Sequence, residues 1–419
     1  MSESSRGAFV TFLLEFSIPL LAGVVVALAA ANLAHETYEH LLHAPWGPLA
    51  VFGHALDLHF VANEIFMVFF FGIAAKEITE SVLPGGSLNP PRKAMNPLFS
   101  TLGGVLGPIA VFFAGLSACH ALDVFGPSPD WPLLSRGWGI PTATDIALAW
   151  LCARFVFGRG HPAIDFLLLL AIADDAIGLV IIAVFYGNPA EPTNPAFLGL
   201  VLAAMAVAFG LRRAGVRAWL PYVALAGPIA WSGLLLAHLH PALALCFVVP
   251  FMPAPRRDTG LFRADDEIAR MGEPLATDLR MRRSTLEEFE HAFKLPVDLG
   301  LFFFAFANAG VAFADIGPMT WLVLGALVVG KLVGISLFGS IAAWLGFPLP
   351  TGMARRDLYM AGFIAALGLT VALFVATAAF RDPVLQGQAK MGALFSGVVG
   401  LVAVALGRAL GMGGRTPDS

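Results

Sequence analysis

The sequence predicts an all-α polytopic membrane protein of about twelve transmembrane helices, with two of them interrupted. Three observations support this fold class. Of the 419 residues, 58% are hydrophobic and only 13% are charged, whereas soluble domains carry about 25% charged residues. Apolar runs of roughly 17–25 residues, enough to cross the hydrocarbon core as a helix, recur along the whole chain. The basic residues also alternate between the two sides of the predicted spans.

The apolar runs, taken in order, give twelve spans. We expect them near residues 10–31, 60–78, 97–119, 138–154, 164–186, 197–211, 219–236, 240–252, 294–313, 318–346, 358–380 and 389–411. Arg6 and the apolar run after it together have the pattern of a signal peptide. However, the run is long enough to span the membrane, and further spans follow it. We therefore interpret it as the first helix of a single transmembrane domain covering residues 1–419.

The distribution of lysine and arginine predicts the orientation. If the N-terminus is cytoplasmic, twenty-one of the 25 basic residues fall inside, Arg136, Arg381 and Lys390 fall outside, and Lys331 lies within a span. The positive-inside rule then places both termini in the cytoplasm. The longest cytoplasmic loop, residues 254–293, mixes both charge signs, and a surface linker and a regulatory segment remain equally open for it.

Other features limit the possible functions. The net charge is −4 and no basic patch contains interleaved aromatic residues, so nothing suggests a nucleic-acid partner. Cys119, Cys152 and Cys246 form no CxxC or Cys/His cluster, which argues against a disulfide framework or a zinc site. The first external loop, about 32–59, is rich in histidine and glutamate. A metal site there is conceivable, but a solvated cap or a dimerisation loop is favoured.

Ionisable residues inside predicted spans are the main functional signal. Each costs at least about 2.5–3.5 kcal/mol in the bilayer, so it indicates a function by default. The strongest cases are Asp145, Asp174, Asp175 and Lys331, which interrupt otherwise apolar runs. Lys331 needs a buried partner, and the aspartates are available. Both a purely structural ion pair and a proton-releasing lysine fit this pattern.

The adjacent aspartates Asp174 and Asp175 suit cation and proton exchange. Neighbours on a helix point about 100° apart, so one can line a hydrated cavity while the other meets a neighbouring helix. Burial favours the protonated carboxyl and a nearby cation favours the ionised form. Carboxylate oxygens are also the ligands that hard cations prefer. The pair can therefore hold protons and give them up to a metal ion.

Asp145 lies in a segment that cannot form a continuous helix. The run Gly137–Ile146 contains Pro141 and two glycines, while Thr142 and Thr144 add oxygen atoms. A second interrupted run is Gly362–Val371. Interrupted spans in both halves of a transporter indicate a midplane ion site between inverted-topology repeats.

Four motifs in order resemble the NhaA-type sodium/proton antiporters along nearly the whole chain. They are Gly139-Ile-Pro-Thr-Ala-Thr-Asp145-Ile-Ala, Ala173-Asp-Asp175-Ala-Ile-Gly, Phe304-Ala-Phe-Ala-Asn308-Ala-Gly-Val and Gly330-Lys-Leu-Val-Gly-Ile-Ser336. The resemblance implies the NhaA fold of inverted repeats with two interrupted crossing helices. It also implies Na⁺, Li⁺ and H⁺ as substrate ions without a further cofactor, a homodimer, and a bacterial inner membrane.

The resemblance assigns roles by position. Asp175 would be the principal carboxylate for Na⁺ and protons. Asp174 would share that ion site, pair with Lys331 and join in proton exchange. Asp145, with Thr144, would lie where the interrupted helices cross and balance their dipoles.

The family's pH-sensing region is matched less completely. Lys76, His240, Glu290 and His291 are the candidate pH-response residues. The family's usual glutamate is Ala74 here, and Lys294 stands where a second histidine is expected. The two histidines fit ordinary interfacial positions equally well.

The predicted function is electrogenic export of Na⁺ or Li⁺ in exchange for proton entry, serving sodium and pH homeostasis. This makes the protein a secondary active transporter and not an enzyme, and neither His-Glu-x-x-His nor Gly-x-Ser-x-Gly occurs. The alternative is a sodium-coupled symporter of an organic anion on a related fold. That alternative needs basic groups at membrane depth besides Lys331. A sensor that binds sodium without counter-flux is a further possibility.

Overall fold

The computed structural model describes the chain in eight stretches, residues 17–47, 50–51, 54–84, 86–89, 91–126, 130–187, 193–254 and 284–412. The chain forms two compact units. Unit 1 comprises residues 1–62, 95–186 and 298–419, and unit 2 comprises residues 63–94 and 187–297. Most of the predicted cytoplasmic loop, residues 255–283, lies outside the described residues, as do both termini and the start of the first predicted span.

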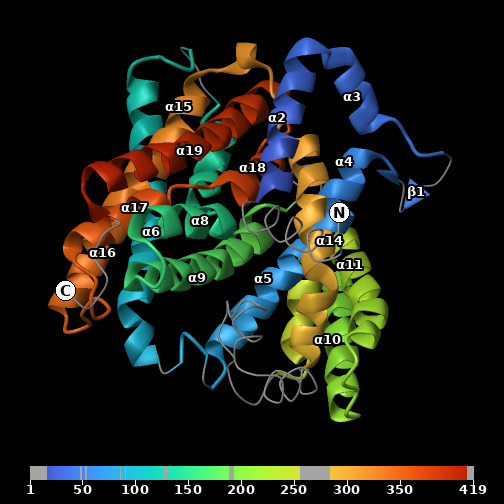
Figure 1. Ribbon diagram of the computed structural model, residues 1–419. Helices are drawn as coiled ribbons and strands as arrows, with labels where there is room; N and C mark the ends of the chain where they lie inside the picture. Colours follow the sequence, from blue (N-terminus) through green and yellow to red (C-terminus); the bar gives the residue numbers. More distant parts are fainter. Residues whose placement is uncertain are drawn as a thin grey trace, which may run out of the picture. The chain divides into compact units, whose positions relative to one another are not determined.

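Unit 1 contains the N-terminal and C-terminal helices (Figure 1). In chain order its elements are α2 (Ile18–Leu33), α3 (His35–His43), β1 (Ala50–Val51), β2 (His54–Ala55), α4 (Leu58–Phe60), most of α6 (Pro91–Ala121), α7 (Trp131–Ser135), the 3₁₀-helix η2 (Arg136–Thr142), α8 (Ile146–Phe157), α9 (Pro162–Phe185), the second half of α14 (Thr285–Asn308), η7 (Phe313–Asp315), α15 (Pro318–Gly325), the π-helix η8 (Ala326–Gly330), α16 (Lys331–Trp344), α17 (Arg355–Ile364), α18 (Leu369–Ala379) and α19 (Pro383–Ala409). The two strands pair antiparallel as a short hairpin.

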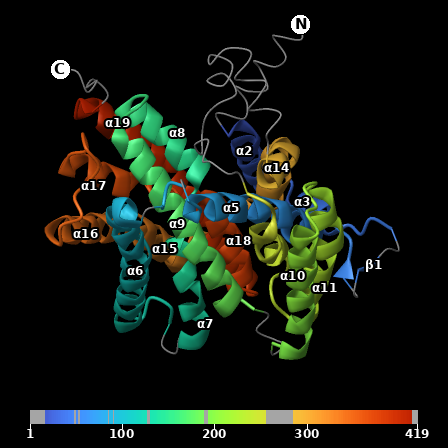
Figure 2. The same cartoon turned by 90° about the horizontal axis from the view of Figure 1, so that it is seen from below.

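Unit 2 is built from the remaining helices. They are η1 (Val61–Phe66, apart from its first two residues), α5 (Met67–Val82), the start of α6, η3 (Pro195–Phe197), α10 (Leu198–Arg213), η4 (Tyr222–Ala226), α11 (Gly227–Leu236), η5 (Pro241–Phe247), η6 (Val249–Phe251) and the first half of α14. Helices α10 and α11 pack side by side (Figure 2).

The all-helical membrane fold is confirmed. Within the described residues, each predicted span coincides with helix: six long apolar helices, two bent helix pairs, three shorter apolar helices and α14. The eighth span differs in kind, because it is a pair of 3₁₀-helices, η5 and η6, and not an α-helix. Pro241 and Pro250 lack the backbone N–H that a continuous α-helical ladder requires.

Glycines fix the helix that carries Lys331 against α6. A Cβ atom added to Gly334 would lie 2.0 Å from the Gly103 carbonyl oxygen, and one added to Gly107 would lie 2.3 Å from the Gly330 oxygen. Gly103/Gly107 and Gly330/Gly334 are both Gly-x-x-x-Gly pairs, the pattern that lets membrane helices approach at backbone distance. Figures 1 and 2 both place α6 beside α16. The position of Lys331 is therefore set by backbone contact.

Substituting Gly334 by alanine is expected to destabilise the protein. Its added methyl group collides with backbone, which cannot rotate away, so the helices must separate at a cost of about 1–3 kcal/mol or more. The measurement is thermal unfolding of the detergent-purified protein. Gly325→Ala is the matched control in the same span, because nothing lies within 4 Å of a Cβ there. Equal melting temperatures for the two variants would contradict the packing described.

Candidate functional site where two interrupted helices meet

Both predicted interruptions are present, and they contact each other. The helix pairs Trp131–Thr142 with Ile146–Phe157 and Arg355–Ile364 with Leu369–Ala379 each bend by 48° at the break. Pro141 precedes the first break, and Ala143 has an extended conformation within it. The backbone N–H of Asp145 donates to the Leu367 carbonyl at 2.6 Å. The two breaks are thus joined by a direct backbone hydrogen bond within unit 1.

Gly368 allows this close approach. A Cβ atom at this position would lie 2.8 Å from the Ala143 carbonyl oxygen, so a larger residue would push the two breaks apart. The hydroxyl of Thr144 adds a second link by donating to the Ala365 carbonyl at 2.9 Å. The predicted crossing of two interrupted helices is therefore confirmed in atomic contacts.

Asp145 connects the N-termini of two half-helices. Its Oδ1 accepts a hydrogen bond from the Leu148 N–H at 3.1 Å, which caps α8. Its Oδ2 accepts from the Thr370 hydroxyl at 2.9 Å and from the Thr370 N–H at 3.3 Å, in the first turn of α18. Helix N-termini carry partial positive charge, so one buried carboxylate stabilises both.

Lys331 contacts the C-terminal end of η2, the half-helix that precedes the first break. Its side chain is fully buried, and Nζ donates to the Thr142 carbonyl at 2.5 Å, to Thr144 Oγ1 at 2.8 Å and to Asp174 Oδ2 at 2.5 Å. The Thr142 carbonyl belongs to the last residue of η2, and the C-terminal end of a helix carries partial negative charge. Three acceptors match the three donors of an ammonium group. The pocket around Nζ therefore fits a protonated lysine paired with an ionised aspartate.

One of the two carboxylate oxygens of Asp174 is not engaged in the ion pair with Lys331. Its Oδ2 forms the Lys331 ion pair, whereas its buried Oδ1 has no hydrogen-bond partner in the described part of the chain. A buried acceptor without a partner is costly and is suited to receive a proton or a cation. Asp175, the next residue of α9, is half-buried, in contrast to the fully buried Asp174. The pair thus combines a buried carboxylate with a more accessible one.

The candidate pH-response residues fall into two groups within unit 2. Lys76 of α5 pairs with Glu290 of α14 and, at 2.7 Å, with Glu80. Lys294 lies 3.8 Å from Glu290. Burial alone would raise the pKa of the Glu290 carboxyl, but Lys76, helped by Lys294 and His291, holds that pKa below its ordinary value. His240, the other candidate, directly precedes η5.

Sequence reasoning missed Thr370, the carbonyl of Thr142 and Glu80. Thr370 lies just after Gly368 in the second interrupted run, so its position next to a break was a usable signal. Glu80 lies four residues after Lys76, the spacing that brings side chains together on a helix. The Thr142 carbonyl carried no signal, because any residue supplies that group.

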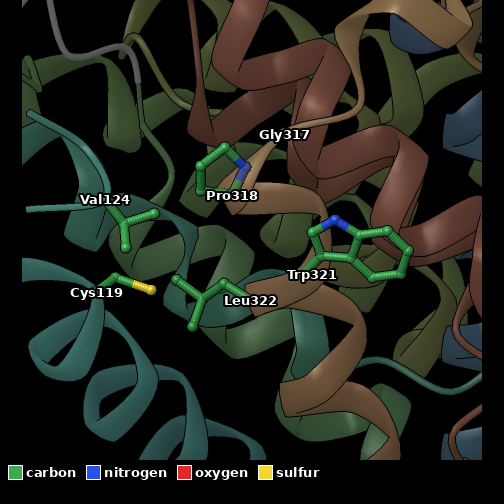
Figure 3. Close-up of a pocket in the computed structure, with 6 residues that line it drawn as sticks. All are labelled: Cys119, Val124, Gly317, Pro318, Trp321 and Leu322. Atoms are coloured by element: carbon green, nitrogen blue, oxygen red, sulfur yellow. The ribbon is translucent and has the colours of Figure 1, made fainter. Parts of the chain in front are cut away.

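Two other features lie apart from these contacts. An apolar surface hollow in unit 1 involves the end of α6 and the start of α15 (Figure 3), and none of the predicted ion-site residues is among its lining residues, Cys119, Val124, Gly317, Pro318, Trp321 and Leu322. Among the described residues, no group of three or more His, Cys, Asp or Glu side chains is arranged to hold a metal ion. The described histidines of the first loop, which is predicted to be external, thus form no such group.

Comparison with known proteins places these features in a family. The family model described as Na⁺/H⁺ antiporter 1 matches residues 12–407. A Na⁺/H⁺ antiporter NhaA of Desulfitobacterium hafniense (strain DSM 10664 / DCB-2) is 55% identical over 410 residues, 98% of each chain. The NhaA of Geobacter sulfurreducens is 56% identical over 402 residues, 96% of this chain and 97% of the relative.

The solved structure of the sodium proton antiporter MjNhaP1 from Methanocaldococcus jannaschii at pH 8 is also similar. Its TM-score is 0.52 at 15% identity, and the match covers 95% of this chain and 90% of that one. This likeness concerns the fold alone. With a family model that spans almost the entire sequence and relatives above 50% identity, the chain belongs to the Na⁺/H⁺ antiporter family that includes NhaA.

Proposed function

We propose that the protein exchanges Na⁺ or Li⁺ for H⁺ by alternating access, as a secondary active transporter of the bacterial inner membrane. The observation that carries this proposal is the buried Lys331–Asp174 ion pair, with its unpartnered Asp174 Oδ1, next to the contact between two interrupted helices. The antiporter names of the relatives support it. They lend no support to the alternative, a sodium-coupled organic-anion symporter.

Competition between protons and sodium follows from the chemistry of the carboxylates. Asp175 is the more accessible of the two and serves as the principal ligand and proton carrier, while Asp174 contributes its free oxygen. Na⁺ binds when Asp175 has lost its proton, and it leaves when Asp175 regains a proton on the other side. Ionised carboxylates provide the charged oxygen ligands that a hard cation prefers, whereas protonated carboxyl groups do not. One site therefore serves both ions in turn.

Lys331 supplies the second proton in this scheme. When Na⁺ occupies the carboxylates, its positive charge replaces that of the ammonium, and Lys331 releases a proton to solvent. Asp175 releases the other, so two protons leave as one Na⁺ binds. Running in reverse on the opposite face, each cycle moves one net positive charge inward with the protons. A membrane potential then contributes about 2.3 kcal/mol per 100 mV.

The oligomeric state and the orientation of the chain are inferred from the family and from the distribution of basic residues. We infer a homodimer with both termini in the cytoplasm and no cofactor beyond the transported ions. Asp145 and Thr144 balance the dipoles at the crossing and hold the carboxylate site in place. Lys76, His240, Glu290 and His291 are proposed to shape the pH response.

Reconstituted proteoliposomes test the exchange itself. An imposed proton gradient, followed with a trapped pH dye, should collapse when Na⁺ or Li⁺ is added and persist when choline is added. Sodium-dependent uptake of a labelled organic anion without proton counter-flux would instead indicate the symporter. Folded protein that gives no response to either cation from acidic through alkaline pH contradicts the antiporter proposal.

The pH response offers a separate prediction at Glu290. Because its pKa in the folded protein is depressed, the stabilisation from the Lys76–Glu290 pair is present above the ordinary carboxyl range and is lost only as the pH falls through the depressed pKa. The pair is therefore intact at neutral pH and acts as a fixed charge. Glu290→Gln removes a negative charge, so neighbouring groups should lose protons at lower pH.

We expect Glu290→Gln to move the pH of half-maximal exchange to lower values, by on the order of half a unit. The measurement is the initial exchange rate in proteoliposomes as a function of pH. Glu288→Gln, an exposed position on the same helix, is the control and should leave the midpoint unchanged. Coincident midpoints for the two variants would remove Glu290 from the pH response.

A further inference from the structure

Arg136 ties together the far ends of the two half-helices that form the candidate site. It is the first residue of η2, and its Nε donates to the carbonyl of Ala379, the last residue of α18, at 3.0 Å. At their other ends, η2 supplies the Thr142 carbonyl to Lys331, and α18 supplies Thr370 to Asp145. The two half-helices are thus held at the site and again at the ends away from it.

Tyr186 attaches the same end of η2 to a third helix. Its hydroxyl donates to the Arg136 carbonyl at 2.7 Å and accepts from the Gly139 N–H at 2.8 Å. A Cβ atom on Gly139 would lie 2.5 Å from that hydroxyl oxygen, so only glycine fits. Tyr186 is buried and directly follows α9, the helix of Asp174 and Asp175. The far end of η2 is therefore connected both to α18 and to the helix of the paired aspartates.

The chemistry of the Arg136 contact makes it stronger than an ordinary tie. The C-terminal carbonyls of α18 carry partial negative charge, and a guanidinium donor forms a charge-assisted bond with them. However, Arg136 Nη2 is buried and has no hydrogen-bond partner among the described residues. This unmet donor means that the tie is incomplete in the present conformation.

We propose that Arg136 is a positioning residue for cation exchange. Its tie to α18 sets the ratio between the conformation that opens the site to one side of the membrane and the conformation that opens it to the other. This inference rests on the proposed alternating-access function. The half-helices can move relative to each other only if the Arg136–Ala379 tie and the Asp145–Thr370 bonds adjust. Weakening the tie shifts the populations of the two conformations, and apparent affinity at each face scales with the population of the competent state.

The test compares apparent KM for Na⁺ at the two membrane faces, in proteoliposomes where all transporters have one orientation. Arg136→Gln should change the ratio of the two KM values by roughly 5-fold or more. Tyr186→Phe keeps the Arg136 guanidinium but removes the two hydrogen bonds that the tyrosine hydroxyl forms with η2. It should change the KM ratio in the same direction. Arg136→Lys, which retains the charge and a donor, should return the ratio toward the wild-type value. Loss of correctly folded protein alone lowers Vmax and leaves the ratio unchanged.

Arg381→Gln is the matched control, because it removes the same charge at an exposed position two residues beyond Ala379 and should leave the ratio unaltered. An unchanged KM ratio in folded Arg136→Gln protein overturns the inference. If that variant does not fold, Tyr186→Phe decides the matter by the same ratio. Failure of the proposed function is distinguishable, since wild-type vesicles would then show no exchange at all.

Discussion

Asp175→Asn is expected to reduce Na⁺/H⁺ exchange by at least about 100-fold while leaving the protein folded. Asparagine neither carries the charge that a sodium ion needs nor takes up a proton, and 100-fold corresponds to about 2.8 kcal/mol. The measurement is the initial rate of dye-detected exchange in proteoliposomes, normalised to reconstituted protein. Asp165→Asn is a matched control, because Asp165 is an exposed carboxylate on the same helix, α9.

Asp174→Asn distinguishes the two carboxylates. It breaks the ion pair and leaves the Lys331 ammonium buried without its anionic partner, which typically costs 3–5 kcal/mol. Asp174→Asn should therefore lower the melting temperature, whereas Asp175→Asn should affect it much less. Wild-type exchange rates in Asp175→Asn would show that the principal carboxylate has been assigned wrongly.

Lys331→Gln is expected to abolish the dependence of the exchange rate on membrane potential. Without the ammonium, the cycle loses one of its two protons and becomes electroneutral. An imposed potential, which contributes about 2.3 kcal/mol per 100 mV in the electrogenic cycle, then no longer drives the exchange. The measurement is the exchange rate with and without a potassium diffusion potential set by valinomycin.

Lys331→Arg serves as the comparison, because arginine keeps a permanent charge at this position but does not release a proton in proteins. Both variants should therefore lack the second proton, while only Lys331→Gln leaves the Asp174 carboxylate without a cation. Unchanged electrogenicity in Lys331→Gln would refute the role assigned to this lysine. It would leave Lys331 with a structural role only.

Much of the site could be predicted because charges inside apolar spans are expensive. Lys331 has to find a buried partner, and the candidates were few. Proline and glycine likewise marked both interruptions, since they remove backbone hydrogen bonds or relax the helix. The spacing of Asp174 and Asp175 implied different surroundings for the two, but only the family resemblance indicated that Asp174 meets Lys331, as the structure has it. That choice depends on how α9 is rotated against α16, which one sequence does not encode locally.

Other features depend on contacts between distant residues or on backbone atoms. Arg136 and Ala379 are 243 residues apart, and the acceptor is a carbonyl group that any residue provides. The π-helical segments η1, η4 and η8 also have no signature in hydropathy, because an extra residue per turn does not change the apolar composition.

Proton release on sodium binding tests the central claim most directly, because it needs no turnover and no membrane. Detergent-solubilised protein in weakly buffered solution is titrated with NaCl, and released protons are followed with a pH dye, with choline chloride as the control. The account predicts saturable release of close to two protons per bound Na⁺, suppressed at low pH and abolished in the Asp174→Asn/Asp175→Asn double variant. Sodium binding without proton release in the wild-type protein would contradict competition of the two ions for these carboxylates.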